Sequence, residues 1–358
     1  MSQETANNAT PYPWQPPLCA TIKGQPEDFR VEELPATLPE GEGEHVWLEI
    51  EKRLMNSEDV AVWLGRESGV GRGRVSYAGR KDRQAVTRQW FSVQCPPESE
   101  PDWSARAEAW TSRQDDGPAA GWMRVRQVAR HARKLRTGHL AGNRFEIRLE
   151  GVEGDRSAAE SILAAIRDGG IPNYFGPQRF GRDNLAKARA WLGGGRPPRS
   201  RNQRSLLLSA ARSAIFNAVL SERVRRGDWD RLVPGDVANL EGSGSVFAVP
   251  EVDAELEVRA RRLDIHPTGP LWGKGEMQTD ADVRALEVAV AAREPALAEG
   301  LEKADVKVAR RALRMVPGVV EWRWEGEDLL LTLELSAGEY ATGILDAICQ
   351  AREAGASA

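Results

Sequence analysis

Residues Val75–Val93 read VSYAGRKDRQAVTRQWFSV and are the most informative stretch of the chain. An apolar strand leads into a turn at Ala78–Gly79, and a second strand is predicted to begin after Thr87. Asp82 lies between these strands among four cations, Arg80, Lys81, Arg83 and Arg88. Such surroundings keep a carboxylate ionised and suit a nucleophile or base beside a phosphodiester chain. They also suit an Asp that caps a turn and pairs with a nearby Arg, and the residues alone leave both readings open.

The segments that flank this stretch alternate between strand and helix patterns. Apolar and polar residues alternate over residues 28–33 and 45–51, and we expect these strands to form a hairpin-like pair with a long loop. A helix is predicted over residues 57–68, and another strand over 145–149. A capping box at Ser157 predicts the start of a further helix, which ends at 169–170.

The composition changes after residue 170, where a second region begins. The patterns there predict helices over 185–192, 205–226 and 279–301, a strand-like region over 236–261 and a Gly/Pro loop over 267–276. Strand patterns return over 319–324 and 329–335, before a final helix over about 339–351. Because the strands before residue 150 and after residue 318 are alike in pattern, we predict an α+β domain interrupted by an insertion.

The overall composition is that of a globular protein of about two domains. The chain has 358 residues, of which 41% are hydrophobic and 28% charged. No apolar run approaches the roughly 20 residues of a membrane-spanning helix, and the first residues do not have a signal-peptide pattern. Three distant cysteines, Cys19, Cys95 and Cys349, make neither a disulfide framework nor a Cys-rich zinc site. We therefore expect a soluble, cytoplasmic protein that binds no membrane.

The charged residues are segregated along the chain. The net charge is −4, yet residues 121–136 hold six basic residues and no acidic one. Residues 176–204 hold eight basic residues and one acidic, and residues 66–88 hold seven and two. These segments would line one phosphate-binding face if the fold brought them together. Charge alone equally allows three solvated faces.

Three candidate sites fail on their spacing. Gly269–Gly275 has Gly275 where a nucleotide-binding P-loop needs Ser or Thr. The glycines of Gly69–Gly73 do not have dinucleotide-binding spacing. Glu40, Glu42 and Glu44 beside His45 are more typical of a solvated loop than of a metal site. We therefore expect neither a cofactor nor a metal.

Several motifs together resemble the tRNA pseudouridine synthase D family. The segment GRKDRQAVTRQWFSV is similar to the family's active-site motif, GxKDxxAxTxQ. Further similar motifs follow in order and with compatible spacing: KGQPEDF from Lys23, GEGEH from Gly41, KLRTG from Lys134, GNRF from Gly142, IPNYFGPQRFG from Ile171, SAARSAIFN from Ser209 and AGEYAT from Ala337. The resemblance spans about residues 23–351.

This resemblance implies an enzyme that isomerises uridine 13 of certain tRNAs to pseudouridine without cofactor or metal. The N1–C1′ bond is cut, the uracil turns, and C5 is joined to C1′. A carboxylate serves this chemistry either by attacking C1′ or through a glycal formed after loss of the C2′ proton, and the sequence does not separate the two routes. The implied partner is tRNA, acted on by a monomer with no protein partner.

The resemblance also assigns roles to particular residues. Asp82 is the catalytic carboxylate, and Lys23 is the cation that orients it. Aromatic walls for the flipped-out uracil are expected at Phe29, Phe145 and Tyr340. Asn143 is expected to bind the uracil edge or to fix the Asp82 loop. The cations expected to meet RNA, mainly through phosphates, are Lys81, Arg83, Arg133, Lys134, Arg136 and Arg179.

The implied fold is the α+β pseudouridine synthase domain with a mixed sheet. We expect it to comprise residues 18–168 and 313–358, with an inserted α+β domain at 169–312 that is specific to the family, and tRNA in the cleft between them. Residues 1–17 are predicted to be a flexible tail, and 96–121 a variable surface excursion. Tyr340 stands where some members have Phe.

Two other classes of protein remain as alternatives. A non-catalytic RNA-binding factor could keep the same fold. The retained pair of Asp82 and Lys23 argues for the enzyme, because a factor without activity would be free to lose its nucleophile. A metal-dependent RNA nuclease would need a ligand cluster, and its activity would not survive EDTA.

Overall fold

A computed structural model of the chain describes residues 11–114, 117 and 120–352. The chain divides into two units. The first, here called the sheet unit, comprises Pro17–Ser157, Pro317–Ala341 and Cys349–Ala358. The second, the helical unit, comprises Met1–Pro16, Ala158–Val316 and Thr342–Ile348. No helix among the described residues is long and apolar enough to cross a membrane.

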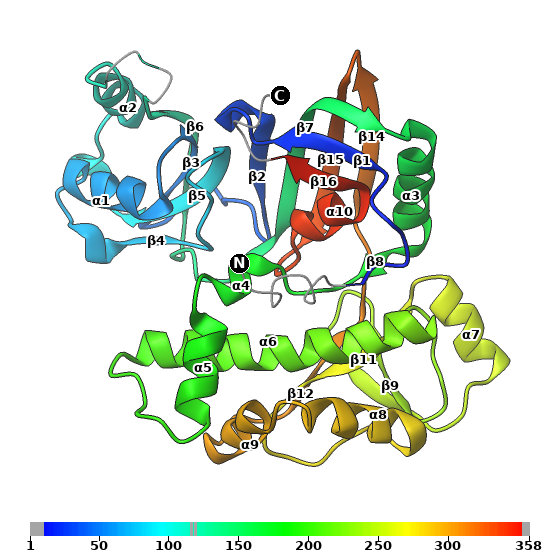
Figure 1. Cartoon of the computed structure of the whole chain (residues 1–358). Helices are drawn as coiled ribbons and strands as arrows, with labels where there is room; N and C mark the ends of the chain where they lie inside the picture. The colour runs from blue at the N-terminus through cyan, green and yellow to red at the C-terminus, as the bar shows by residue number, and fades with distance from the viewer. Residues whose placement is uncertain (1–10, 115–116, 118–119, 353–358) are drawn as a thin grey trace. The chain divides into compact units, whose positions relative to one another are not determined.

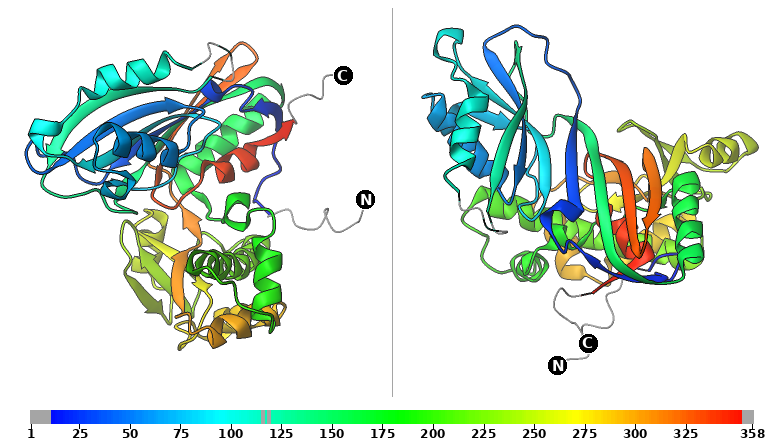
Figure 2. Two further views of the ribbon diagram at one scale, coloured as in Figure 1. Left: turned by 90° about the vertical axis from the view of Figure 1, so that its left-hand side faces the viewer. Right: turned by 90° about the horizontal axis from the view of Figure 1, so that it is seen from above.

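Ten strands of the described residues form one mixed sheet in the sheet unit, with the order β14-β15-β7-β2-β5-β3-β6 (Figure 1). Strand β1 pairs with β7 and β16, and β4 pairs with β5. The strands are β1 (Leu18–Ile22), β2 (Phe29–Pro35), β3 (His45–Arg53), β4 (Val75–Tyr77), β5 (Val86–Gln94), β6 (Trp122–His131), β7 (Leu140–Gly154), β14 (Val319–Glu325), β15 (Asp328–Ser336) and β16 (Cys349–Arg352). The sheet is strongly twisted, as Figure 2 shows.

The expected hairpin between the first two predicted strands does not form. Strand β5 lies between β2 and β3, parallel to β2 and antiparallel to β3. Most β5 residues are buried on both faces of the sheet, which favours a central position. The loop between β2 and β3 is too long to force those strands together. The individual strands were predicted correctly, but their pairing was not.

The core of this part of the sheet extends into the segment expected to be a surface excursion. Helices α1 (Ser57–Glu67) and α2 (Trp103–Thr111) belong to this unit, with short 3₁₀ turns at Pro26–Asp28, Arg72–Arg74 and Pro97–Ser99. Trp103 is buried and its ring centroid lies 6.4 Å from that of Trp63 in α1. The prediction was therefore wrong for α2, whose aromatic side chain is part of the core.

The helical unit holds a four-stranded sheet with the order β10-β9-β11-β12 and a two-stranded pair, β13-β8. Its strands among the described residues are β8 (Ile171–Pro172), β9 (Asp236–Leu240), β10 (Val246–Val249), β11 (Ile265–Leu271), β12 (Ala309–Ala312) and β13 (Arg314–Met315). Its helices are α4 (Pro177–Phe180), α5 (Asn184–Leu192), α6 (Arg201–Arg226), α7 (Ala254–Arg261), α8 (Ala281–Ala291) and α9 (Pro295–Lys303), together with most of α3 (Arg156–Gly169) and α10 (Ala341–Ile348). Helix α6 packs against β11 (Figure 1).

Four predicted elements of this region and the chain end differ from the structure. The helix predicted over 279–301 is two helices, α8 and α9, because the first ends at Ala291. Residues 254–261 form helix α7 rather than a strand, because Asp253 caps its N-terminus by accepting a hydrogen bond from the Leu256 N–H at 2.8 Å. The expected loop at 267–276 begins inside strand β11, where the Pro267 carbonyl still accepts from the Leu313 N–H. The last predicted helix ends at Ile348, and β16 follows.

The described end of the expected tail makes defined contacts within the helical unit. Residues 1–10 lie outside the described residues. Tyr12 packs edge-on against Tyr174, with ring centroids 5.5 Å apart, and the Tyr174 hydroxyl donates to the Pro11 carbonyl at 2.9 Å. Burial raises the pKa of both tyrosines. Residues 11 and 12 therefore differ from the expectation of a flexible tail.

A buried ion pair stabilises the helical unit. Arg223 donates to both carboxylate oxygens of Asp236, at 2.8 and 3.0 Å, and both side chains are almost fully buried. We expect Asp236→Asn to lower the free energy of unfolding by about 3 kcal/mol, because it removes the fully buried carboxylate that pairs with Arg223 and leaves only the partly exposed Asp228 as a charge partner. Urea unfolding measures this. The matched control is Glu257→Gln, which removes the exposed pair with Arg261 and should cost less than about 1 kcal/mol. Equal losses would contradict the prediction.

Candidate active site

The loop between β4 and β5 presents Asp82 to a lysine from a distant segment. Lys23 lies between β1 and β2, and its Nζ is 2.5 Å from Asp82 Oδ2. The other oxygen, Oδ1, accepts the Gln84 N–H at 3.1 Å. The Asp82 side chain remains 43% exposed. One carboxylate is thus fixed by a cation and a backbone N–H while staying open to solvent on one side.

The surroundings keep Asp82 ionised. Partial burial acts to raise its pKa, but the hydrogen bond and charge of Lys23, with the Gln84 and Arg83 backbone N–H groups, outweigh it. The pKa of Asp82 therefore lies below its usual value. An ionised, half-exposed carboxylate is the form that a nucleophile or a base requires.

Two aromatic rings extend the site from Lys23. The Lys23 Nζ lies 4.0 Å from the centroid of the Phe29 ring, in cation–π contact. Phe29 meets Phe145 edge-on, with centroids 6.0 Å apart and planes at 68°. The register of β2 with β7 places both rings on one face of the sheet. Phe29 and Phe145, two of the three rings predicted to hold the uracil, therefore lie against each other and near Lys23, although both are largely buried.

Lys81 differs from the expectation that it meets a phosphate. Its Nζ lies 3.0 Å from Glu33 Oε2 and donates to Asn143 Oδ1 at 2.5 Å. The Lys81 side chain is only 7% exposed and that of Glu33 only 1%. Burial raises the pKa of Glu33, and Lys81 offsets part of that rise. Lys81, Glu33 and Asn143 thus form a buried polar cluster, and Lys81 is next to Asp82 in the chain.

Two buried side chains that the sequence reading did not single out hold the backbone of this loop. Gln89 donates to the Gly79 carbonyl and accepts from the Ser57 hydroxyl at 2.7 Å. The Ser57 hydroxyl in turn accepts the Lys81 N–H at 2.9 Å. A signal for Gln89 existed, since it is the last residue of the motif GRKDRQAVTRQ. No comparable signal marked Ser57, the first residue of α1.

A buried lysine adds positive charge near the same loop. Lys52 is fully buried and donates to the Met55 carbonyl at 2.6 Å. Burial and, to a smaller extent, the Lys81 charge lower the pKa of Lys52 to about 8, although Asp82 opposes the fall. Asp82 therefore interacts electrostatically with Lys52 in addition to its contact with Lys23.

The remaining predicted cations have varied surroundings. Arg133, Lys134 and Arg136 are exposed in the loop between β6 and β7. Arg83 is exposed and donates to the Leu54 carbonyl at 3.2 Å. Arg179, in the helical unit, donates to the Ser209 hydroxyl at 2.9 Å.

Tyr340 is half-buried in the sheet unit. It follows β15, whose Leu335 pairs with Asn143. The chain thus reaches Tyr340 from the end of the sheet that carries the buried polar cluster.

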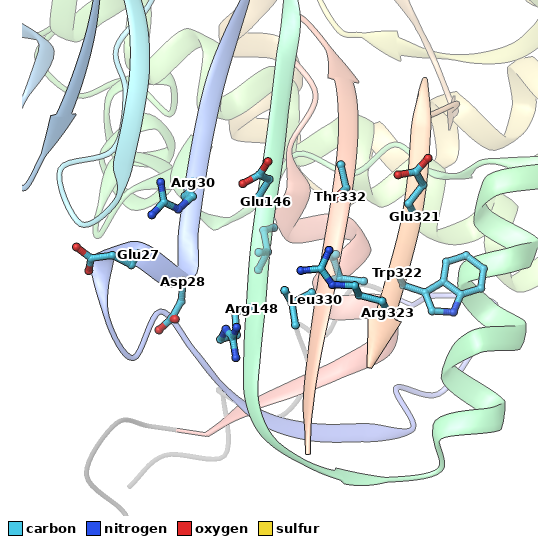
Figure 3. A pocket seen from close by; sticks show the side chains of 12 residues that line it. Glu27, Asp28, Arg30, Glu146, Arg148, Glu321, Trp322, Arg323, Leu330 and Thr332 are labelled. Carbon is cyan, nitrogen blue, oxygen red and sulfur yellow. The ribbon is translucent and has the colours of Figure 1, made fainter. Parts of the chain in front are cut away.

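A pocket of about 470 Å³ lies on the opposite face of the sheet (Figure 3). Glu146, Ile147 and Arg148 line it from β7. Arg148 is paired with Glu325 and Asp328. The pocket excludes Asp82 and Lys23 and is therefore separate from the candidate site.

The sequence matches one family over most of its length. The sequence model of the family described as tRNA pseudouridine synthase D (TruD) matches residues 8–188 and 199–348. The motifs predicted that the resemblance starts at about Lys23, whereas the match begins at residue 8. A tRNA pseudouridine synthase D of Nitrosococcus oceani is 44% identical over 359 residues, which cover 99% of this chain and 97% of that protein. One of Pseudomonas aeruginosa is 42% identical, with 91% and 89% covered.

The fold is similar to that of a crystal structure from Methanosarcina mazei assigned as a tRNA pseudouridine synthase D. The TM-score is 0.69 at 19% identity, and the match covers 94% of this chain and 95% of that one. This confirms the predicted fold class. Together with the family match and the close relatives, it also confirms the resemblance seen in the motifs: this chain belongs to the tRNA pseudouridine synthase D family.

Proposed function

We propose that this chain is a tRNA pseudouridine synthase that isomerises uridine, at position 13, with Asp82 as its catalytic carboxylate. The observation that carries the proposal is the 2.5 Å contact of Lys23 Nζ with Asp82 Oδ2 in the loop with the family's motif. The reaction breaks N1–C1′ and forms C5–C1′; a proton leaves C5 and N1 gains one. The reactants and products balance without an oxidant or a reductant.

The side chains divide the work as follows. Asp82, held ionised, attacks C1′ or assists through a glycal, and Lys23 orients it by a charge-assisted hydrogen bond. Phe29, Phe145 and Tyr340 hold the flipped-out uracil against flat apolar surfaces while it turns. The buried pair of Lys81 and Glu33 keeps the loop in place during the reaction.

The proposal is tested with the recombinant chain and an unmodified tRNA transcript that carries U13. We expect pseudouridine at position 13 and at no other uridine, in the presence of EDTA. A tRNA that is bound but left unmodified would favour the non-catalytic RNA-binding factor. A cleaved tRNA would favour the nuclease. Comparing pseudouridine maps of tRNA from cells with and without the gene then identifies the cellular substrates.

We also propose that the enzyme works as a monomer in the cytoplasm, with tRNA as its macromolecular partner. Its three cysteines are free, which fits a reducing compartment. Sedimentation of the chain alone and with tRNA tests the stoichiometry, and one chain per tRNA is expected.

The aromatic wall predicts a separation of catalysis from folding. Phe145→Leu keeps most of the apolar bulk but loses the flat face, so the single-turnover rate should fall about tenfold or more. The thermal midpoint should fall by no more than it does in a core control, because the ring is largely buried. The matched control is Phe91→Leu in the buried core, which should lower the midpoint and leave the rate of folded enzyme unchanged. A lowered midpoint with a normal rate in Phe145→Leu would place that ring in the core instead.

The exposed cations after β6 predict a change in salt dependence. Replacing Arg133, Lys134 and Arg136 together by Ala should weaken tRNA binding and flatten the slope of log K against log salt by up to about 0.9 per lost phosphate contact. Turnover at saturating tRNA should change little. Filter binding between low and high salt measures the slope, with Arg261→Ala as an exposed control. An unchanged slope would make this segment a solvated face.

A further inference from the structure

A second pocket of the sheet unit, of about 340 Å³, lies beside the loop that follows β6. Its lining comprises Thr37, Glu40, Trp47, His131, Ala132, Arg133, Lys134, Arg136 and His139. None of the residues that form the Asp82 site lines it. The pocket combines three exposed cations, Arg133, Lys134 and Arg136, with His131, which is nearly buried. The hydrogen bonds of His131 indicate which ligand the pocket can bind.

His131 is held in one orientation by its neighbours. Its ring stacks on Trp47, with centroids 4.5 Å apart and planes at 18°. Its Nδ1 accepts the Arg133 N–H at 2.8 Å. Because Nδ1 accepts, the proton of the neutral ring is on Nε2, which is therefore a hydrogen-bond donor. The histidine is fixed before any ligand arrives.

The Nε2 donor has no hydrogen-bond acceptor among the described residues, although the side chain is only 8% exposed. The nearest carboxylate oxygen, Oε1 of Glu40, is 3.9 Å away, beyond hydrogen-bond length, and Glu40 is mostly exposed. A buried donor left without an acceptor is costly, and most such groups in proteins are satisfied. His131, which lines the pocket, therefore has a donor without an acceptor in the described part of the chain.

Hydrogen bonds and packing hold the backbone of the loop that carries Arg133, Lys134 and Arg136. The Trp47 indole N–H donates to the Arg133 carbonyl at 2.9 Å, and the Leu135 N–H donates to the Ser92 hydroxyl at 2.9 Å. The Leu135 side chain is buried against Trp47 and Trp90. No ion pair joins Arg133, Lys134 or Arg136 to a carboxylate within the described part of the chain. Their charges are thus available to an anion.

We infer that this pocket binds one phosphate group of the substrate RNA, with His131 Nε2 donating to a non-bridging oxygen. Neutral imidazole supplies direction, and the three cations supply charge, which together suit a phosphodiester. The inference rests on the proposed function for the identity of the ligand. The inference goes beyond the proposed function in two ways. It names His131 as a contact, and it assigns one phosphate to a defined pocket rather than to a diffuse basic surface.

The location links this phosphate to the catalytic loop. The Gly138 N–H, at the end of the basic loop, donates to the Ala78 carbonyl at 2.7 Å. Ala78 lies four residues before Asp82 in the same loop. A phosphate held in the pocket therefore fixes the RNA backbone relative to the segment that carries the nucleophile.

The first test uses His131→Phe, which keeps a flat ring on Trp47 and removes the Nε2 donor. We expect tRNA binding to weaken about five- to tenfold with an unchanged salt slope, since no charge is lost. Arg133→Ala should weaken binding and flatten the slope. A His131→Phe variant that binds tRNA as tightly as the wild type would overturn the inference. Inorganic phosphate serves as a second probe. If His131→Phe lost its binding of inorganic phosphate but bound tRNA normally, the ligand of the pocket would be a small phosphate compound, and the inference would also be overturned.

The second test changes the RNA as well as the protein. A scan of tRNA with single methylphosphonate linkages should reveal one linkage at which binding weakens more in the wild type than in His131→Phe, because the variant has already lost one contact to that phosphate. Glu40→Gln should strengthen tRNA binding, because a negative charge beside the phosphate is removed. A lowered thermal midpoint with unchanged binding in Glu40→Gln would make Glu40 the partner of His131 and overturn the inference. Failure of the proposed function is distinct: tRNA would then stay unmodified whether or not this linkage matters.

Discussion

Asp82→Asn is expected to abolish pseudouridine formation while tRNA binding persists. Asn keeps the shape of the side chain and one acceptor oxygen, but it loses the negative charge and with it the nucleophile or base. Losing the reacting group of an enzyme commonly lowers turnover by 10⁴-fold or more, about 5 kcal/mol in activation free energy. Binding should hold, because affinity for tRNA rests mainly on cations that meet phosphates. Single-turnover assays with excess enzyme, read beside filter binding, separate the two effects.

The matched control for this variant is Asp102→Asn. Asp102 caps α2 by accepting the Ala105 N–H at 3.0 Å, in the same unit but outside the site. That change should cost at most about 1 kcal/mol of stability and leave turnover normal. Full activity of Asp82→Asn would remove Asp82 from catalysis, whereas loss of tRNA binding along with activity would show that the loop itself had been disrupted.

The sequence predicted local elements better than their pairing. Helix α1 and strands β3, β4 and β5 were expected at nearly their observed bounds, since each has a clear apolar period and a distinct end. The insertion of β5 between β2 and β3 depends on contacts among residues far apart in the chain, which no local pattern encodes. Strand β11 was missed because it contains Pro267 and Pro270, and proline is rare inside strands.

The same distinction applies to the candidate site. The motif around Asp82 and the resemblance identified both partners of the Lys23–Asp82 pair, and the structure brings them together. Lys81 was expected to meet a phosphate because it is a cation adjacent to Asp82 in the chain, whereas its partner Glu33 lies on another strand. His131 carried no signal at all, since only the fold stacks it on Trp47. Charge and motifs therefore predicted which residues belong to the site. Their contact partners depend on tertiary packing, which the sequence pattern does not show.

Lys23→Met is expected to lower the single-turnover rate by about 10³-fold, about 4 kcal/mol, and to shift its pH dependence. Removing one directed donor from an active site typically costs 10²- to 10³-fold, and here the donor is also charged. Met keeps the length of the side chain, and Lys23 has a positive φ of 58° that strains Met as it strains Lys. The comparison therefore isolates the ammonium group rather than the backbone.

The pH profile distinguishes positioning from mere packing. In the wild type Lys23 helps to hold the pKa of Asp82 below its usual value, so the carboxylate stays ionised in mildly acidic solution. Without Lys23, burial raises that pKa unopposed by the ammonium, and the acid limb of the rate profile should move to higher pH. Lys23→Arg keeps the charge and should return the limb toward its wild-type position. An acid limb that is the same in all three proteins would show that Lys23 does not control the ionisation of Asp82.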